Sequence, residues 1–165
     1  MAKTDSFFIR ASVTTQNNAT FDQDNIDLGA YVDALGKSVL RIHNVAVQIV
    51  NNATNLPPSD GGLTADMAWQ LTTQSQSALV AATDKSVIST GALRCIAPGG
   101  ELYESSDVIP QEWTQGYLVG VEQIYLGALA SANWATTDIT VNVVMECTVE
   151  TLSQSAAMAL ALSQQ

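Results

Sequence analysis

The sequence predicts an all-β protein, an eight-stranded antiparallel β-sandwich with one short helix near its C-terminus. Two observations lead to this fold class. Extended segments in which apolar and polar residues alternate recur along the chain, separated by turn-rich breaks. Only the last stretch, about residues 152–162, has a helix-forming composition. No internal repeat or linker interrupts this pattern, so we expect residues 1–165 to form a single domain.

The clearest alternation lies in Asp138–Glu150. One side of this extended segment is apolar, with Ile139, Val141, Val143, Met145, Cys147 and Val149. The other side carries Asp138, Thr140, Asn142, Glu146, Thr148 and Glu150, with Val144 as the one apolar exception. A period of two is typical of a strand with one buried face and one polar face. Because amides and hydroxyls accompany only three acids, we expect the polar face to contact a neighbouring subunit.

Seven further segments are predicted as strands. In chain order they are Ser6–Thr15, Ile26–Val32, Lys37–Val50, Asp66–Thr73, Ser86–Ala97, Glu101–Tyr103 and Tyr117–Ala128. The strongest break, residues 51–62, contains two prolines and two glycines, which exclude regular structure. Lys37–Val50 has apolar residues on both faces, which predicts a strand enclosed between layers or against a partner. Within Tyr117–Ala128, Gly120 and Gly127 indicate bulges or close backbone approach.

The C-terminal segment Leu152–Leu162 is rich in alanine and leucine, with Thr151 or Ser153 available as the N-cap. It is apolar on nearly every side, which an isolated surface helix does not tolerate. We therefore expect the helix to pack on its own domain or on a neighbouring subunit. The interface residues predicted from it are Leu152, Met158, Leu160 and Leu162.

The composition limits the classes of partner. Charged residues make up only 13% of the chain and the net charge is −10. The six basic residues are scattered, whereas nucleic-acid binding needs clustered cations, so we expect no direct contact with nucleic acid. The uncharged polar surface suits repeated subunit contacts, because few charges have to be desolvated there.

Each arrangement of residues that could carry out catalysis lacks at least one of the residues it needs. His43 is the only histidine, and it lies inside a predicted strand, where a structural role is favoured. No nucleophile motif of the G-x-S-x-G type occurs, so we expect no enzymatic activity. Cys95 and Cys147 each occupy a core-facing strand position, which favours two buried free thiols, with a disulfide between strands as the alternative.

Two features could bind a ligand. The acidic residues Asp22, Asp24 and Asp27 are spaced closely enough to converge on calcium, although the glycine and glutamate of an EF-hand are missing; a solvated loop is the alternative. Trp134 in a loop, and Trp113, are candidates for an exposed interface or sugar-binding platform. A tryptophan that covers the rim of the core is the alternative.

Targeting signals are not expected. The first ten residues place Asp5 and Arg10 around a four-residue apolar patch, unlike a secretory signal. No window reaches the roughly eighteen apolar residues that span a bilayer. We expect synthesis in the cytoplasm and no transmembrane segment.

The strand order, ending in Tyr117–Ala128, Asp138–Glu150 and a short helix, resembles the small single jelly-roll capsid proteins of tailless viruses. The resemblance extends over most of the chain as a pattern and includes no specific motif. It implies a jelly roll and a structural protein that forms a closed shell with copies of itself or with a second capsid protein. The acidic balance departs from shell proteins whose basic arms hold the genome.

Three functions are consistent with these observations. The first is a self-assembling capsid subunit, made in the host cytoplasm and located in the virion. The second, also structural, is a tail-tube or decoration protein of a tailed phage. The third, from a different class, is a lectin-like adhesion module that would use Trp134 or Trp113 with calcium at Asp22, Asp24 and Asp27.

Overall fold

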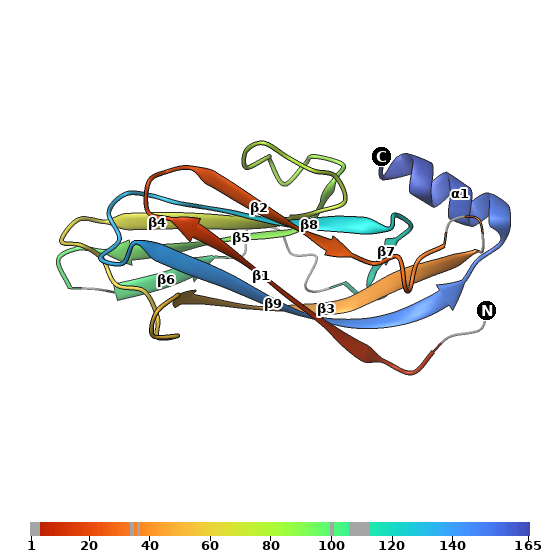
Figure 1. The fold of residues 1–165 in the computed structure, drawn as a ribbon, viewed down its shortest axis with the longest axis horizontal. Helices are drawn as coiled ribbons and strands as arrows, with labels where there is room; N and C mark the ends of the chain where they lie inside the picture. Colours follow the sequence, from red (N-terminus) through yellow and green to blue (C-terminus); the bar gives the residue numbers. More distant parts are fainter. Residues whose placement is uncertain (1–3, 34, 36, 100, 106–112) are drawn as a thin grey trace.

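The computed structural model describes residues 4–165, apart from residues 34, 36, 100 and 106–112. Two antiparallel sheets pack face to face, and a helix lies at one end of the sandwich (Figure 1). The predicted all-β sandwich with a C-terminal helix is therefore confirmed.

The order of the strands defines a jelly roll. Sheet A contains, side by side, β1 (Phe7–Gln16), β9 (Asp138–Thr151), β3 (Ser38–Asn51) and β7 (Tyr117–Val119). Sheet B contains β2 (Phe21–Asp27), β8 (Gln123–Ala130), β4 (Ala65–Thr72), β5 (Val87–Ile96) and β6 (Glu101–Ser105). The chain crosses between the sheets repeatedly, so that the first and last strands become neighbours. Two interleaved sheets with this order are the arrangement of a jelly roll.

The described residues form nine strands, whereas the sequence predicts eight. The predicted strand Tyr117–Ala128 is in fact two, because the chain passes from sheet A to sheet B at residues 120–122. The predicted strand Ile26–Val32 is also misplaced. The strand ends at Asp27, and the backbone N–H groups of Tyr31 and Val32 then donate to the Leu28 carbonyl in a tight turn.

A β-bulge at His43 explains the strand that looked apolar on both faces. Before the bulge Leu40 and Ile42 face the core, and after the register shift Val45 and its alternate neighbours do. One extra residue exchanges the two faces of a strand, so the core-facing series continues on one side of β3 past the bulge. The prediction of burial on both faces holds at the two ends of β3, where Val39 and Val50 on the outer face are also buried, but not in its middle, where Asn44, Ala46 and Gln48 are exposed.

The core lies between the sheets and is built from their inward-facing apolar side chains. Its largest fully buried members are Trp69, Leu40, Ile42, Leu71, Ile88, Ile124, Leu126, Ile139 and Met145, with Leu28 at the end of β2. The alternation predicted for Asp138–Glu150 is confirmed, since Ile139 to Cys147 contribute every second residue to this core.

Helix α1 (Gln154–Ser163) covers one end of the sandwich (Figure 1). Ser153 is the N-cap, as one of the two predicted alternatives, and its hydroxyl accepts from the Ala156 N–H. Ala157 and Ala161 are buried, and a Cβ added to Gly120 would lie 3.1 Å from the backbone nitrogen of Ala161. The predicted close backbone approach at Gly120 is thus the contact between the β7–β8 turn and α1.

The two outer faces of the sandwich differ. The connection between β4 and β5, residues 73–86, folds over the outer face of sheet B, where the Gln70 side chain donates to the Ala78 carbonyl and accepts from the Val80 N–H. On the outer face of sheet A the side chains of Arg10, Ser12, Ala46 and Gln48 are exposed. Sheet A therefore presents the more open face.

Candidate subunit-contact surfaces

The outer face of sheet A is formed by the second set of alternating positions on β1, β9 and β3. It includes Phe8, Arg10, Ser12 and Thr14 on β1, then Thr140, Asn142, Val144, Glu146, Thr148 and Glu150 on β9, and Asn44, Ala46 and Gln48 on β3. Most of these side chains are uncharged, as the sequence predicts for the polar face of Asp138–Glu150. Because the strands are long and regular, the face is suited to broad contact with another protein surface.

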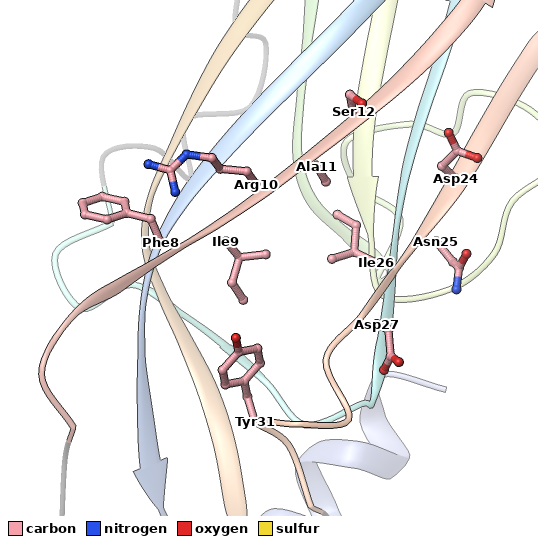
Figure 2. A pocket seen from close by; sticks show the side chains of 10 residues that line it. All are labelled: Phe8, Ile9, Arg10, Ala11, Ser12, Asp24, Asn25, Ile26, Asp27 and Tyr31. Carbon is pink, nitrogen blue, oxygen red and sulfur yellow. The ribbon is translucent and has the colours of Figure 1, made fainter.

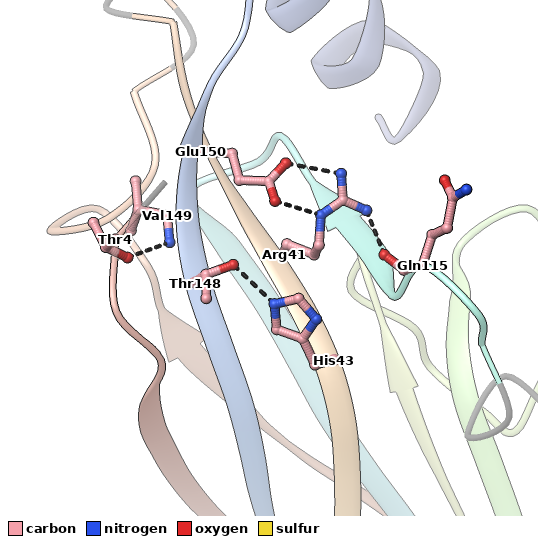
Figure 3. A network of polar contacts seen from close by, with 7 residues as sticks. All are labelled: Thr4, Arg41, His43, Gln115, Thr148, Val149 and Glu150. Atoms are coloured by element: carbon pink, nitrogen blue, oxygen red, sulfur yellow. Dashed lines mark hydrogen bonds and ion pairs between the residues drawn. The ribbon is translucent and has the colours of Figure 1, made fainter. Parts of the chain in front are cut away.

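One end of this face holds an internal polar network (Figure 3). The Arg41 guanidinium binds the Glu150 carboxylate through two contacts, Nε to Oε1 at 2.7 Å and Nη2 to Oε2 at 2.8 Å. The third guanidinium nitrogen donates to the Gln115 carbonyl. The hydrogen bond to Glu150 raises the pKa of Arg41. With side-chain exposures of 16% and 7%, the pair belongs to the subunit itself rather than to a free binding surface.

His43 belongs to the same network. Its Nε2 lies 2.9 Å from the Thr148 hydroxyl, and Thr148 is buried (Figure 3). Because of the bulge, His43 lies on the side of Arg41, away from the core-facing Val45 and Val47. The predicted structural histidine is confirmed, because its contact is an internal hydrogen bond between adjacent strands.

The outward side of α1 is the second candidate surface. Met158 is 44% exposed and Leu162 is 68% exposed. Leu160, by contrast, is half-buried against Gly120, and Leu152 is half-buried with its N–H donating to the Lys37 carbonyl. The helix therefore packs on its own domain with one side and exposes apolar side chains on the other. Of the four predicted helix residues, Met158 and Leu162 are the accessible ones.

Trp134 does not lie at an accessible surface of the subunit. It is 3% exposed, and its indole N–H donates to the Asp66 carbonyl at 3.0 Å. The side chain closes the rim of the core, which was the alternative reading of the sequence. Trp113 is half-buried beside Tyr117, with 5.3 Å between ring centroids. An exposed loop tryptophan was therefore a wrong expectation for Trp134, because a loop residue can fold back onto the core.

The three candidate calcium ligands lie along β2 and do not converge. Asp22 and Asp24 share the face of the strand that carries Ile26, whereas Asp27 points to the other face and accepts from the Gly29 N–H. Among the residues that the structure describes, no group of three or more acidic, histidine or cysteine side chains could hold a metal ion. The sequence placed these carboxylates in a loop, whereas the extended strand separates them.

A groove of about 610 Å³ runs between the edge strands β1 and β2 (Figure 2). Its wall includes Ile9, Asp24, Ile26 and Tyr31, and Tyr31 also stacks on Phe7 with 4.8 Å between ring centroids. The groove lies at the open side of the sandwich. It combines a few apolar side chains with exposed carboxylates and contains no constellation that resembles a catalytic site.

Both cysteines are free thiols buried in different sheets, Cys95 in β5 and Cys147 in β9. The predicted buried free thiols are confirmed. Burial raises the pKa of both thiols, that of Cys147 to about 12. At neutral pH they are therefore protonated and poor nucleophiles.

We expect native protein to react slowly with Ellman's reagent, because a thiol pKa of about 12 leaves on the order of a thousandfold less thiolate than an exposed cysteine has. Unfolding in guanidinium chloride should release two reactive thiols per chain. Rapid reaction of both thiols in the native protein would contradict the burial seen here, and a Cys147→Ser variant assigns the slower of the two.

The pair Phe8 and Arg10 was not predicted from the sequence as part of a contact surface. Only the strand Ser6–Thr15 was predicted there. The signal was present, however, because alternation places Phe8 on the polar side of that strand, where a large aromatic is unexpected. In the structure Phe8 is 55% exposed and the Arg10 guanidinium lies over its ring, 5.7 Å from the centroid.

No protein-family model matches the chain, and no curated protein matches its sequence. Among solved structures it is similar to a chain of desmodium yellow mottle tymovirus (8% identity, TM-score 0.38, covering 90% of this chain and 89% of that one). It is also similar to VP1 of trichodysplasia spinulosa-associated polyomavirus, solved with GM1 oligosaccharide (7% identity, TM-score 0.42, 89% and 94% covered). A third similar chain comes from the capsid asymmetric unit of cyanophage Pam1 (14% identity, TM-score 0.38, 87% and 84% covered).

All three structures come from viruses, and the third is a chain of a capsid asymmetric unit. Because each TM-score lies below 0.5, the jelly-roll assignment rests on the strand order observed here and not on the similarities. Helix α1, with 10 residues, is not long enough to cross a membrane, and the structure has no other helix among its described residues that is.

Proposed function

We propose that this chain is a structural virion protein, a capsid subunit that assembles with copies of itself into a closed shell. The observation that carries the proposal is the division of α1 into two sides. One side closes its own jelly roll through Ala157 and Ala161, and the other leaves Met158 and Leu162 exposed. An exposed apolar stripe on a subunit with few charged residues supports the proposal that a neighbouring copy covers these side chains.

The composition supports the same role. Since the net charge is −10 and the basic residues are scattered, the proposal assigns subunit contacts rather than genome contacts to this chain. A second capsid protein could share the shell. The proposed role requires no catalysis. The groove between β1 and β2 and the polar network around Arg41 contain no arrangement of residues that suggests a catalytic activity.

The direct test is the native mass of the purified protein, followed by electron microscopy in negative stain. We expect closed particles of megadalton mass. A species that stays near the monomer mass of 17.4 kDa at high protein concentration would contradict the proposal. Hollow tubes would instead identify the alternative of a tail-tube protein.

We expect the double variant Met158→Asp/Leu162→Asp to abolish particles while keeping the melting temperature within a few degrees of wild type. Both side chains are exposed, so the two carboxylates add a desolvation cost only to a contact between subunits. The matched control is Ala156→Glu, which adds a carboxylate away from the stripe and completes a capping box with Ser153. Particles that form normally from the double variant would exclude α1 as a contact.

A further inference from the structure

The outer face of sheet A carries a compact patch where β1 and β9 pair. Phe8 lies directly opposite Glu146, and Arg10 lies directly opposite Val144. Figure 2 shows the Phe8 and Arg10 side chains together on the side of β1 away from Ile9 and Ile26, which face the interior. We call these four residues the β1–β9 patch. Val144 is also the one residue that breaks the polar side of Asp138–Glu150 in the sequence.

The charges of the patch lie on a diagonal. Adjacent strands are about 4.8 Å apart and alternate residues along a strand about 6.8 Å apart, so the Cα atoms of Arg10 and Glu146 are separated by about 8 Å. The apolar members, Phe8 and Val144, occupy the other diagonal. Within the described part of the chain neither Arg10 nor Glu146 forms an ion pair, and the Arg10 guanidinium lies over the Phe8 ring.

Such a patch is complementary to itself. Two copies can meet face to face about a two-fold axis that lies in the plane between them. If this axis crosses the line from Arg10 to Glu146 at its midpoint and at a right angle, each Arg10 faces the other copy's Glu146. The same operation brings Phe8 and Val144 opposite their own counterparts in the other copy. Cation then meets carboxylate twice, and apolar side chains meet apolar side chains, which is the requirement for an isologous contact.

We propose that the β1–β9 patch is a two-fold contact between two copies of this chain. The occupant is a second copy, because a patch with one side chain of each sign on a diagonal presents to an identical patch the charges that satisfy both of its own. The surrounding outer-face residues Ser12, Asn142 and Gln48 are uncharged, so they place no like charges opposite one another. This inference rests on the proposed function, and it supplies a second contact distinct from the α1 stripe.

Two contacts of different symmetry are what a closed shell needs. An isologous contact alone stops at a dimer, whereas a heterologous contact continues from subunit to subunit. With the patch as the two-fold contact, the exposed side of α1 becomes the candidate for the continuing contact. The dimer is then expected to persist when the α1 contact is removed.

The test is therefore made in the Met158→Asp/Leu162→Asp background, where sedimentation velocity can measure a dimer without particles. We expect a monomer–dimer equilibrium. Arg10→Glu makes the patch wholly acidic and Glu146→Arg makes it wholly basic, so each variant alone should weaken the dimer by about tenfold or more. The double reversal Arg10→Glu/Glu146→Arg should dimerise again, and so should an equimolar mixture of the two single variants, which pair acidic patch with basic patch.

The matched control is Arg94→Glu, which changes the net charge by the same amount but lies on β5 of the other sheet. It should leave the dimer unchanged. Absence of a dimer, a dimer insensitive to Arg10→Glu, or a mixture that stays monomeric would each overturn the two-fold contact. If the dimer forms but the wild-type chain forms no particles, the capsid function is contradicted while the two-fold contact stands.

Discussion

Replacing Trp69 by alanine is expected to lower the free energy of unfolding by about 3–5 kcal/mol. Trp69 is 2% exposed in β4 and is among the largest fully buried side chains of the core. Its position opposite Gly91 is part of the reason, because a Cβ on Gly91 would lie only 2.7 Å from the indole nitrogen. The ring thus occupies the space that a side chain on β5 would otherwise fill, and Gly91 has no side chain to move into the cavity that alanine leaves.

Equilibrium unfolding in urea, monitored by circular dichroism, measures this effect. Trp113→Ala is the matched control, since Trp113 is only half-buried and should cost less than Trp69 does. A loss below about 1 kcal/mol for Trp69→Ala would show that the core relaxes around the site, contrary to its close packing.

The second large effect is expected for Glu150→Ala, with a loss of about 3 kcal/mol. Glu150 is 6% exposed and holds the Arg41 guanidinium through two short hydrogen bonds. Removing the carboxylate leaves the Arg41 charge largely buried beside the Gln115 carbonyl and without its ion pair, and an uncompensated buried charge is costly.

A double-mutant cycle of Arg41→Met, Glu150→Leu and the two together tests this explanation. The double variant removes both charges and fills similar volume, so it should be clearly more stable than Glu150→Leu alone. The nearby Thr148→Val variant serves as the control, because it removes only the neutral hydrogen bond to His43 and should cost about 1 kcal/mol. Additive losses in the cycle would mean that Arg41 and Glu150 do not stabilise one another.

Several elements could be predicted because their information is local. The alternation of Asp138–Glu150 places its apolar side on the core in the structure, since the side-chain period of a strand follows from the backbone alone. Ser153 caps α1 for a similarly local reason, because its hydroxyl satisfies a backbone N–H of the first helical turn.

Other features depend on contacts between distant residues. The bulge at His43 cannot be read from β3 alone, because it is the pairing with β9 that leaves one residue over between Ile42 and Asn44. The division of Tyr117–Ala128 into two strands depends on their partners, because β7 pairs with β3 in sheet A and β8 pairs with β2 and β4 in sheet B. Trp134 looked accessible in a loop, yet its hydrogen bond to Asp66 draws it into the core.

The polar face of Asp138–Glu150 illustrates the difference between what the sequence pattern determines and what the tertiary structure determines. The residue pattern alone establishes that this strand has an apolar side and a polar side with few charges, and that Val144 interrupts the polar side. Each of these is a property of residues close together in the sequence. That Arg10 and Phe8 stand beside Val144 and Glu146 was decided by strand pairing across more than 130 residues of sequence. The β1–β9 patch exists only in the folded subunit, since the pairing register of two strands distant in sequence is set by the packing of the whole core.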